Sequence, residues 1–189
     1  MVICFGESKT SFPEQAIFFY FRQITTAYNR YMIDSKTEID IYLPEFNIGI
    51  EYDGIFWHSD KKSLLREETK YRICKERKKR KEEKLLDLGI TLIRVREVES
   101  KTCKHIIRAK PGANDIELSI MLKELFSLVS SLIKKTLDVD IDVARDRYKI
   151  YEQYIQSEKD NSLAVVNPQL ASEWHPHKNN GLLPEYVSA

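Results

Sequence analysis

Residues able to bind a metal or move a proton follow a short apolar run in this sequence. In the segment IGIEYDGIFWHSD (48–60), the apolar IGI leads into Glu51, Asp53 and His58. Carboxylates bind hard cations such as Mg²⁺. An imidazole with an ordinary pKa of about 6.5 can take up or release a proton near neutral pH. Together these residue types are suited to a metal-assisted hydrolysis.

The surrounding pattern predicts the element that positions them. EIDIYL (38–43) and NIGIEYDG (47–54) both alternate between apolar and other residues, which is typical of strands. The intervening LPEF predicts a tight turn, so the two strands form a hairpin. Residue numbers that lie opposite each other then sum to about 90 or 91. Because side chains alternate between faces, Asp40, Glu51 and Asp53 are expected on the same face.

Such a cluster of carboxylates must be compensated. Two unit charges about 4 Å apart repel by roughly 4 kcal/mol at an effective dielectric of 20. A proton or a cation must therefore lie among the three carboxylates unless their face is fully solvated, which is the alternative interpretation. Mg²⁺ fits the first interpretation, since it takes carboxylate and carbonyl oxygens and retains several waters.

At this point the residues resemble a known family. EIDIYLPEFNIGIEYDGIFWH and the later GITLIRVRE (89–97) are similar to the core of the PD-(D/E)xK restriction-endonuclease-like nucleases. Within them, the branch related to the very-short-patch repair endonuclease is the most similar. The resemblance covers roughly the first hundred residues. It implies a restriction-endonuclease-like three-layer α/β core, with a mixed sheet of four or five strands flanked by helices.

The resemblance also implies roles for individual residues. Asp40 matches the central metal-binding aspartate, Glu51 matches the acidic residue of the half-motif, and the Tyr52 carbonyl matches the backbone ligand. Asp53 stands where the family has its lysine, so the usual cation beside the attacking water is missing from the motif. His58 matches a histidine that takes part in catalysis in the repair-endonuclease branch.

Glu14 has two interpretations. The resemblance implies an acidic residue on the first helix that approaches the metal. The pattern Ser11-x-x-Glu14 is also a capping box, in which the glutamate bonds back to the Ser11 amide. The two roles do not exclude each other, and Glu14 is kept among the candidate catalytic residues.

A basic block follows the acidic cluster. Residues 61–110 hold 18 Lys and Arg against 8 Asp and Glu, a net charge of +10 in a chain whose total is +1. A solvated helix face with Glu/Lys pairs is one interpretation. A surface that contacts DNA phosphates is the other, and the neighbouring nuclease-like motif favours it. The candidate nucleic-acid-binding residues are Trp57, Arg72, Arg77, Lys78, Arg80 and Lys81.

Hydrophobic periodicity predicts the remaining elements. Pro13 in the first turn and Gly89 at the end mark helix boundaries. The predicted helices cover 11–28, 63–88, 116–135 and 141–155, and a further strand covers 90–97. We expect an endonuclease-like core over 1–110, a helical addition packed on that core over 111–156, and a linker with an incomplete zinc-ribbon-like tail over 157–189.

The tail and the cysteines predict no zinc site. NPQLASEWHPHKNNGLLPEYV resembles the start of a treble-clef zinc-ribbon repeat, but the paired cysteines that complete such a site are missing. Cys4, Cys74 and Cys103 are widely spaced and are expected to be free thiols. No apolar run approaches the roughly 20 residues that span a bilayer, so a cytoplasmic location without membrane contact is expected.

The sequence thus predicts a Mg²⁺-dependent endodeoxyribonuclease in which Mn²⁺ can substitute. DNA is the expected partner, and a homodimer stays open beside a monomer. One rival is a nuclease-like module that binds nucleic acid without cutting it, suggested by Asp53 at the lysine position. The other is a structural role in which the basic helix binds RNA or an acidic protein.

Overall fold

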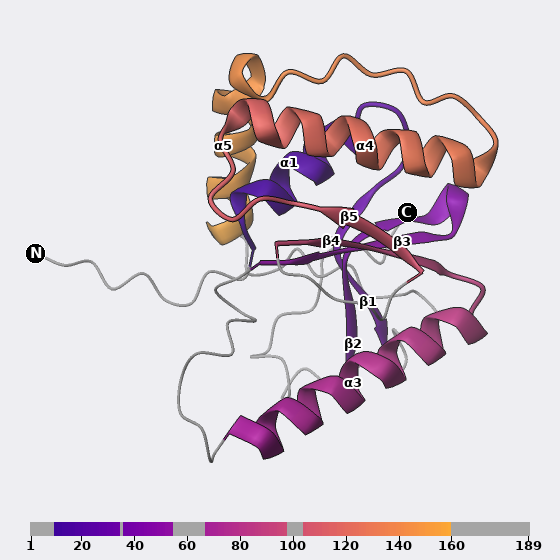
Figure 1. Cartoon of the computed structure of the whole chain (residues 1–189). Helices are drawn as coiled ribbons and strands as arrows, with labels where there is room; N and C mark the ends of the chain where they lie inside the picture. The colour runs from indigo at the N-terminus through magenta and orange to yellow at the C-terminus, as the bar shows by residue number, and fades with distance from the viewer. Residues whose placement is uncertain (1–9, 35, 55–66, 98–103, 160–189) are drawn as a thin grey trace, which may run out of the picture.

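A computed structural model describes residues 10–34, 36–54, 67–97 and 104–159, and for 67–75, 77 and 157–159 the backbone alone. Over these residues the chain forms a mixed α/β structure with a five-stranded sheet flanked by helices (Figure 1). The strands are β1 (Tyr28–Asp34), β2 (Thr37–Leu43), β3 (Ile48–Asp53), β4 (Thr91–Arg96) and β5 (His105–Arg108). The helices are α1 (Phe12–Phe21), α3 (Glu67–Asp87), α4 (Asp115–Ile133) and α5 (Val143–Lys159), with a short 3-10 turn η1 (Pro44–Phe46).

The sheet follows chain order, β1-β2-β3-β4-β5. The pairs β1/β2 and β2/β3 are antiparallel, whereas β3/β4 and β4/β5 are parallel. A parallel pair needs a crossover connection, and α3 lies within the one between β3 and β4. In Figure 1, helices α1, α4 and α5 lie on one side of the sheet and α3 lies on the other. The mixed sheet predicted from the sequence is confirmed in these coarse terms.

The hairpin has the predicted register. Ile41 lies opposite Ile50 and Leu43 opposite Ile48, so paired residue numbers sum to 91. The turn is η1, and Asn47 closes it in the left-handed conformation with φ 50°. Asparagine tolerates this conformation better than most residues. The short turn and the period of two together set which side chains share a face.

The first helix is shorter than predicted. Ser11 caps it as expected, its hydroxyl accepting from the Glu14 N–H at 3.3 Å, but the helix ends at Phe21 instead of continuing to residue 28. The β-branched Thr25 and Thr26 lie in the connection that follows. Strand β1 then begins at Tyr28, a strand that the sequence pattern did not predict.

The later elements agree more closely with the sequence. Strand β4 and helices α3, α4 and α5 fall within or near their predicted ranges, while residues 63–66 of the predicted helix lie outside the described part. Gly89 follows the end of α3 with φ 71°, the left-handed conformation expected there. Asn114 and Glu117 form a capping box on α4. Strand β5 was not predicted.

One large apolar core joins α1, α4 and α5 to the sheet. Its fully buried members include Phe21 of α1, Ile50 of β3, Leu122 of α4 and Ile150 of α5. The helical addition predicted over 111–156 therefore shares its core with the first hundred residues. A smaller cluster on the opposite face contains Ile39, Ile90 and Leu85. No helix within the described residues is long and apolar enough to cross a membrane.

Candidate active site

Strands β2 and β3 separate at the predicted acidic pair. Their paired register ends at Ile41 and Ile50, and continuing its sum of 91 by one residue would bring Asp40 to Glu51. From here, hydrogen bonds between side chains and the backbone take the place of backbone–backbone pairing. The Asp40 N–H donates to Glu51 Oε1 at 3.3 Å, and the Tyr52 N–H donates to Asp40 Oδ2 at 2.8 Å. The two carboxylates are thus fixed beside a gap between strands.

The Asp40 carboxyl group lies in an environment that opposes ionisation. Its pKa is raised well above the ordinary value, first by burial of the carboxyl and then by the charges of Glu51 and Glu14. The Lys81 charge and the Tyr52 N–H act in the opposite direction and do not compensate fully. A positive charge added beside Asp40 would stabilise its ionised form.

Glu14 reaches this site from α1. Only 7 % of the residue is exposed, and burial raises the pKa of its carboxyl from 4.5 to about 7, against the lowering effect of hydrogen bonds from Thr10 and Asn29. Asn29 Nδ2 donates to Glu14 Oε1 at 3.0 Å and also to the Asp40 carbonyl oxygen at 3.0 Å. Ser11 therefore caps the helix while the Glu14 carboxylate turns toward β1 and β2. Only half of the predicted capping box is present among the described residues, because the Glu14 carboxylate bonds to Thr10 and Asn29 and not back to the Ser11 amide.

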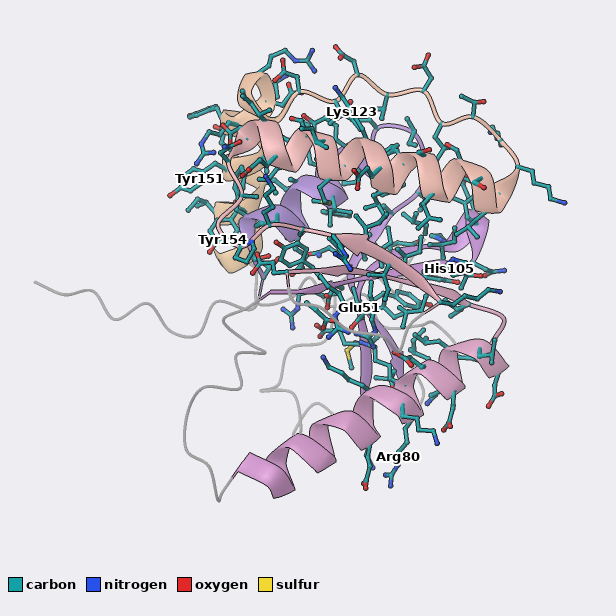
Figure 2. All side chains as sticks on the ribbon, viewed as in Figure 1. Glu51, Arg80, His105, Lys123, Tyr151 and Tyr154 are labelled. Carbon is teal, nitrogen blue, oxygen red and sulfur yellow. The ribbon has the colours of Figure 1, made fainter. Side chains whose placement is uncertain are left out.

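Two lysines on α3 lie against the β3 carboxylates. Lys81 Nζ lies 2.6 Å from Glu51 Oε1, and Lys78 Nζ lies 3.3 Å from Asp53 Oδ1. Residues three apart on a helix face the same way, as do residues two apart on a strand. Figure 2 shows Glu51 on the side of the sheet that faces α3. Both lysines were predicted as phosphate contacts, yet here each is paired with a β3 carboxylate.

Asp53 is the centre of a buried charged cluster. Its Oδ2 lies 3.1 Å from Arg94 Nη1 and 3.2 Å from Arg96 Nε. Arg94 is 2 % exposed and also pairs with Glu82 of α3, Nε to Oε1 at 3.0 Å. Burial would lower the pKa of the Arg94 guanidinium, but Asp53, Glu51 and Glu82 outweigh it and raise that pKa. Asp53 therefore connects β3 and β4 to α3.

The other predicted site residues are not all within the described part of the chain. Trp57 and His58 lie outside it, and the side chains of Arg72 and Arg77 on α3 are not described. Arg80 is exposed and points away from the sheet in Figure 2. Of the cysteines, Cys4 and Cys103 lie outside the described residues, as do the tail histidines, and the Cys74 side chain is not described.

The donor set suits a hard divalent cation. Asp40, Glu51 and Glu14 offer carboxylate oxygens alone, the ligand type that Mg²⁺ and Mn²⁺ prefer. As the side chains lie, no three Asp, Glu, His or Cys residues among those described already form a metal-binding group. Instead, the Lys81 ammonium occupies one side of Glu51. The residues fit Mg²⁺ in chemistry, and Lys81 must share Glu51 with it.

Sequence reasoning missed several residues that shape the site. Asn29 and Arg30 lie on the unpredicted β1, and Arg30 pairs with Glu38 at 3.1 Å. Arg30 also has a left-handed φ of 54°, which is uncommon for a residue that is neither glycine nor asparagine. In the β1/β2 register this position lies across from Asp40. The apolar Tyr31 and Ile33 could have indicated a strand. No local signal connects Asn29 to Glu14.

Comparison with known proteins does not identify a family or a function for this chain. No protein family model, no curated protein and no solved structure matches the chain. The arrangement of Asp40, Glu51, Glu14 and Lys81 is therefore the structural basis from which a function can be inferred.

Proposed function

We propose that this protein is a metal-dependent DNA endonuclease with a restriction-endonuclease-like core. The proposal is supported by an antiparallel hairpin whose strands separate at Asp40 and Glu51, and by a third carboxylate, Glu14, that approaches from α1. The parallel β3–α3–β4 crossover and the basic block on α3 agree with the resemblance seen in the sequence. DNA is the expected substrate because its phosphates match that basic block.

One observation carries the proposal most directly. Asp40 and Glu51 are in contact, with the Asp40 N–H donating to Glu51 Oε1 at 3.3 Å, and the pKa of the Asp40 carboxyl is raised first by burial and then by the charges of Glu51 and Glu14. A fold that only needed stability would gain by separating such groups or replacing them with apolar residues. Carboxylates held together against repulsion are typical of sites whose task is to hold a cation.

The chemistry follows from the requirements of phosphodiester hydrolysis. A water oxygen forms a bond to phosphorus, the bond to one bridging oxygen breaks, the water loses a proton and the departing oxygen gains one. A bound Mg²⁺ would supply Lewis acidity at the phosphate oxygens. Asp40 and Glu51 would hold that ion, with Glu14 beside them. His58, predicted from the sequence as the proton carrier, lies outside the described residues.

Lys81 is the candidate for the lysine that the half-motif lacks. Asp53 occupies the motif position, but Lys81 brings an ammonium group to within 2.6 Å of Glu51 from α3. There it can donate a hydrogen bond to the attacking water or to a phosphate oxygen once a metal takes over Glu51. We therefore assign Lys81 a catalytic role, whereas the sequence analysis placed it among the residues that contact DNA phosphates.

The same ion pair favours a second candidate function. An ammonium 2.6 Å from Glu51 already neutralises one carboxylate without any metal. A protein that had lost metal binding could keep this arrangement and still bind nucleic acid through its basic block. In that case DNA binding is salt-sensitive, and calorimetry with Mn²⁺ detects no binding.

The first test is cleavage of duplex, nicked and single-stranded DNA with Mg²⁺ or Mn²⁺. We expect cleavage by the purified chain and a loss of at least about a thousandfold in Asp40→Asn, because the isosteric amide cannot hold the metal. Intact DNA in all three substrates, or equal cleavage by the variant, would rule out the proposed activity.

The second test compares the two lysines of α3. Lys81→Met should lower kcat about a hundredfold with little change in KM, as expected for loss of a group that acts on the reacting atoms. Lys78→Met is the matched control, since Lys78 lies three residues earlier and pairs with Asp53 instead of Glu51. It should mainly raise KM. Equal effects of the two variants would assign Lys81 to DNA binding alone.

A further inference from the structure

Three amide side chains from different elements form a row of hydrogen bonds that ends at the acidic site. Gln153 Nε2 of α5 donates to Gln15 Oε1 of α1 at 2.7 Å. Gln15 Nε2 donates to Asn29 Oδ1 of β1 at 3.0 Å. Asn29 Nδ2 donates to Glu14 Oε1 at 3.0 Å. Gln15 has no exposed surface and Asn29 keeps 4 %, so the middle of the row is closed to bulk water.

The two ends of the row fix its direction. At the outer end, Arg22 Nη1 donates to Gln153 Oε1 at 3.3 Å, and a guanidinium can only donate. At the inner end, Asn29 Nδ2 also faces the Asp40 carbonyl oxygen, which can only accept, so the Asn29 nitrogen lies on the Glu14 side in either protonation state of Glu14. Each amide between them must then present its oxygen toward Arg22 and its nitrogen toward Glu14. Reversing any one of them would place two donors or two acceptors against each other.

Asn29 connects the row to the second carboxylate as well. Its Nδ2 also donates to the carbonyl oxygen of Asp40 at 3.0 Å. The same amide group therefore holds the Glu14 side chain and the β2 backbone at the point where β2 and β3 separate. A change in the orientation of Asn29 would disturb the Glu14 carboxylate and the backbone that carries Asp40.

We propose that Gln153, Gln15 and Asn29 are positioning residues that fix the Glu14 carboxylate for metal binding and make α5 part of the site. The proposal rests on the proposed function, because the metal is what a fixed Glu14 serves. Helix α5 already packs on the core through Ile150, which is fully buried. Apolar packing alone does not need an aligned row of amides that leads to a carboxylate. A row of aligned hydrogen bonds also polarises its members in the same sense, which strengthens the last bond to Glu14.

The first arm of the test uses the metal-free full-length protein. Gln153→Met keeps the length of the side chain but removes its donor and acceptor. Gln156→Met is the control, because Gln156 is exposed one turn further along the same helix. We expect the side-chain NH₂ signals of Asn29 in a ¹⁵N spectrum to shift in Gln153→Met and to stay in place in Gln156→Met. A residue that only stabilised α5 would lower Tm without moving the signals of a side chain on β1.

The second arm measures Mn²⁺ affinity by calorimetry. Asn29→Leu should weaken binding by about tenfold or more, the effect common for a residue that orients a metal ligand. Gln15→Met should have a smaller effect, and Gln153→Met should weaken binding by about threefold, which corresponds to one net hydrogen bond. Gln156→Met should bind as wild type does. This decreasing order along the row is the specific signature of positioning.

The outcomes separate this proposal from the proposed function. If the wild-type protein binds no Mn²⁺, the metal site fails, and the Asn29 signals still decide whether the row transmits a change from α5 to β1. Unmoved Asn29 signals in Gln153→Met overturn the proposal whether or not metal binds. Normal Mn²⁺ binding together with equal affinity in the Gln153 and Gln156 variants overturns it as well.

Discussion

The two faces of the sheet are built from different interactions. On the face covered by α1, α4 and α5, most buried contact is apolar, as in the stacking of Phe21 on Phe126 with ring centroids 4.1 Å apart. The amide row and the Tyr20–Asp146 hydrogen bond are buried polar contacts within it. On the face covered by α3, the described contacts are mostly ion pairs. Leu85 is the only buried apolar residue among the α3 side chains that the structure describes. The α3 pairs are Lys78–Asp53, Lys81–Glu51, Glu82–Arg94 and Lys84–Asp34.

This difference indicates a division of tasks. Apolar burial contributes about 25 cal/mol per Å² and needs no precise partner, so the α1/α4/α5 face can carry most of the stability. Buried ion pairs contribute little net stability but fix geometry and charge. Glu51 and Asp53 therefore lie where α3 can hold carboxylates and ammonium groups in set positions, while Glu14 acts on Asp40 from α1. Four changes test the comparison, in order of expected effect on the free energy of unfolding.

The largest effect is expected on the apolar face. Phe126→Ala removes a ring that is 4 % exposed and stacked on Phe21, and should lower the free energy of unfolding by about 3 to 5 kcal/mol. Leu86→Ala on α3 is the control, since Leu86 is 75 % exposed and should change stability by less than about 0.5 kcal/mol. Urea denaturation measures both. A small effect of Phe126→Ala would mean that the apolar face does not dominate stability.

The next effect concerns the charged face. Asp53→Ala leaves the buried Arg94 guanidinium with Glu82 as its remaining ion-pair partner among the described residues, and should cost about 3 kcal/mol. Replacing both residues, as in Asp53→Ala with Arg94→Met, removes the uncompensated charge and should recover part of that loss. Urea denaturation of the two single variants and the double variant gives the interaction free energy between Asp53 and Arg94. Purely additive losses would show that Asp53 and Arg94 do not act as a pair.

A third effect is the pH dependence of the metal-free protein. The pKa of Glu14 is raised from 4.5 to about 7 by burial, so the folded state holds a proton that the unfolded state releases. Its contribution is complete below about pH 4.5 and is lost as the pH rises toward 7. Stability should fall by about 2 to 3 kcal/mol over that window from this residue alone. Asp40, whose pKa is raised as well, acts in the same direction.

Glu14→Gln is the control for the pH effect. The amide does not titrate, so the fall in Tm over the same window should become smaller in this variant. Saturating Mg²⁺ should have a similar effect on the wild-type protein, because a bound cation stabilises the ionised carboxylates. An unchanged pH profile in Glu14→Gln would show that other groups cause the dependence.

The sequence was sufficient for the elements whose own periodicity determines them. The β2–β3 register follows from two short alternating runs and a tight turn. Of the two expected sums, the structure has 91, which continues to Glu51 and not Ile50 beside Asp40. The strong amphipathic pattern of α4 predicted its range within two residues at each end. Such features need only information within a few residues of chain.

The contacts that complete the site depend on distant segments. Lys81 meets Glu51 only because α3 crosses β3 at one particular position, which no helical pattern specifies. Asn29 lies in a strand whose burial alternates regularly, but one buried position is the polar Asn29 and the half-buried positions include Tyr28 and Met32, so the sequence pattern did not reveal the strand. The role of Asp53 also needed the structure. The motif made Asp53 a candidate catalytic residue and left open whether it marks a variant or a disabled active site, whereas in the structure its carboxylate pairs with Arg94 and Arg96.

The smallest effect tests whether charge alone holds α3 in place. Lys79 and Glu83 pair at 3.6 Å on the outer face of α3, with side chains 76 % and 59 % exposed. Lys79→Ala should change the free energy of unfolding by less than about 0.5 kcal/mol, since water and salt screen such a pair. If it costs more than about 1 kcal/mol, the outer charges of α3 stabilise the helix itself, and the buried pairs with β3 are not what distinguishes this face. If Lys79→Ala costs less than that, the contribution of α3 to the free energy of unfolding depends on where its charges lie and not on how many charges it carries.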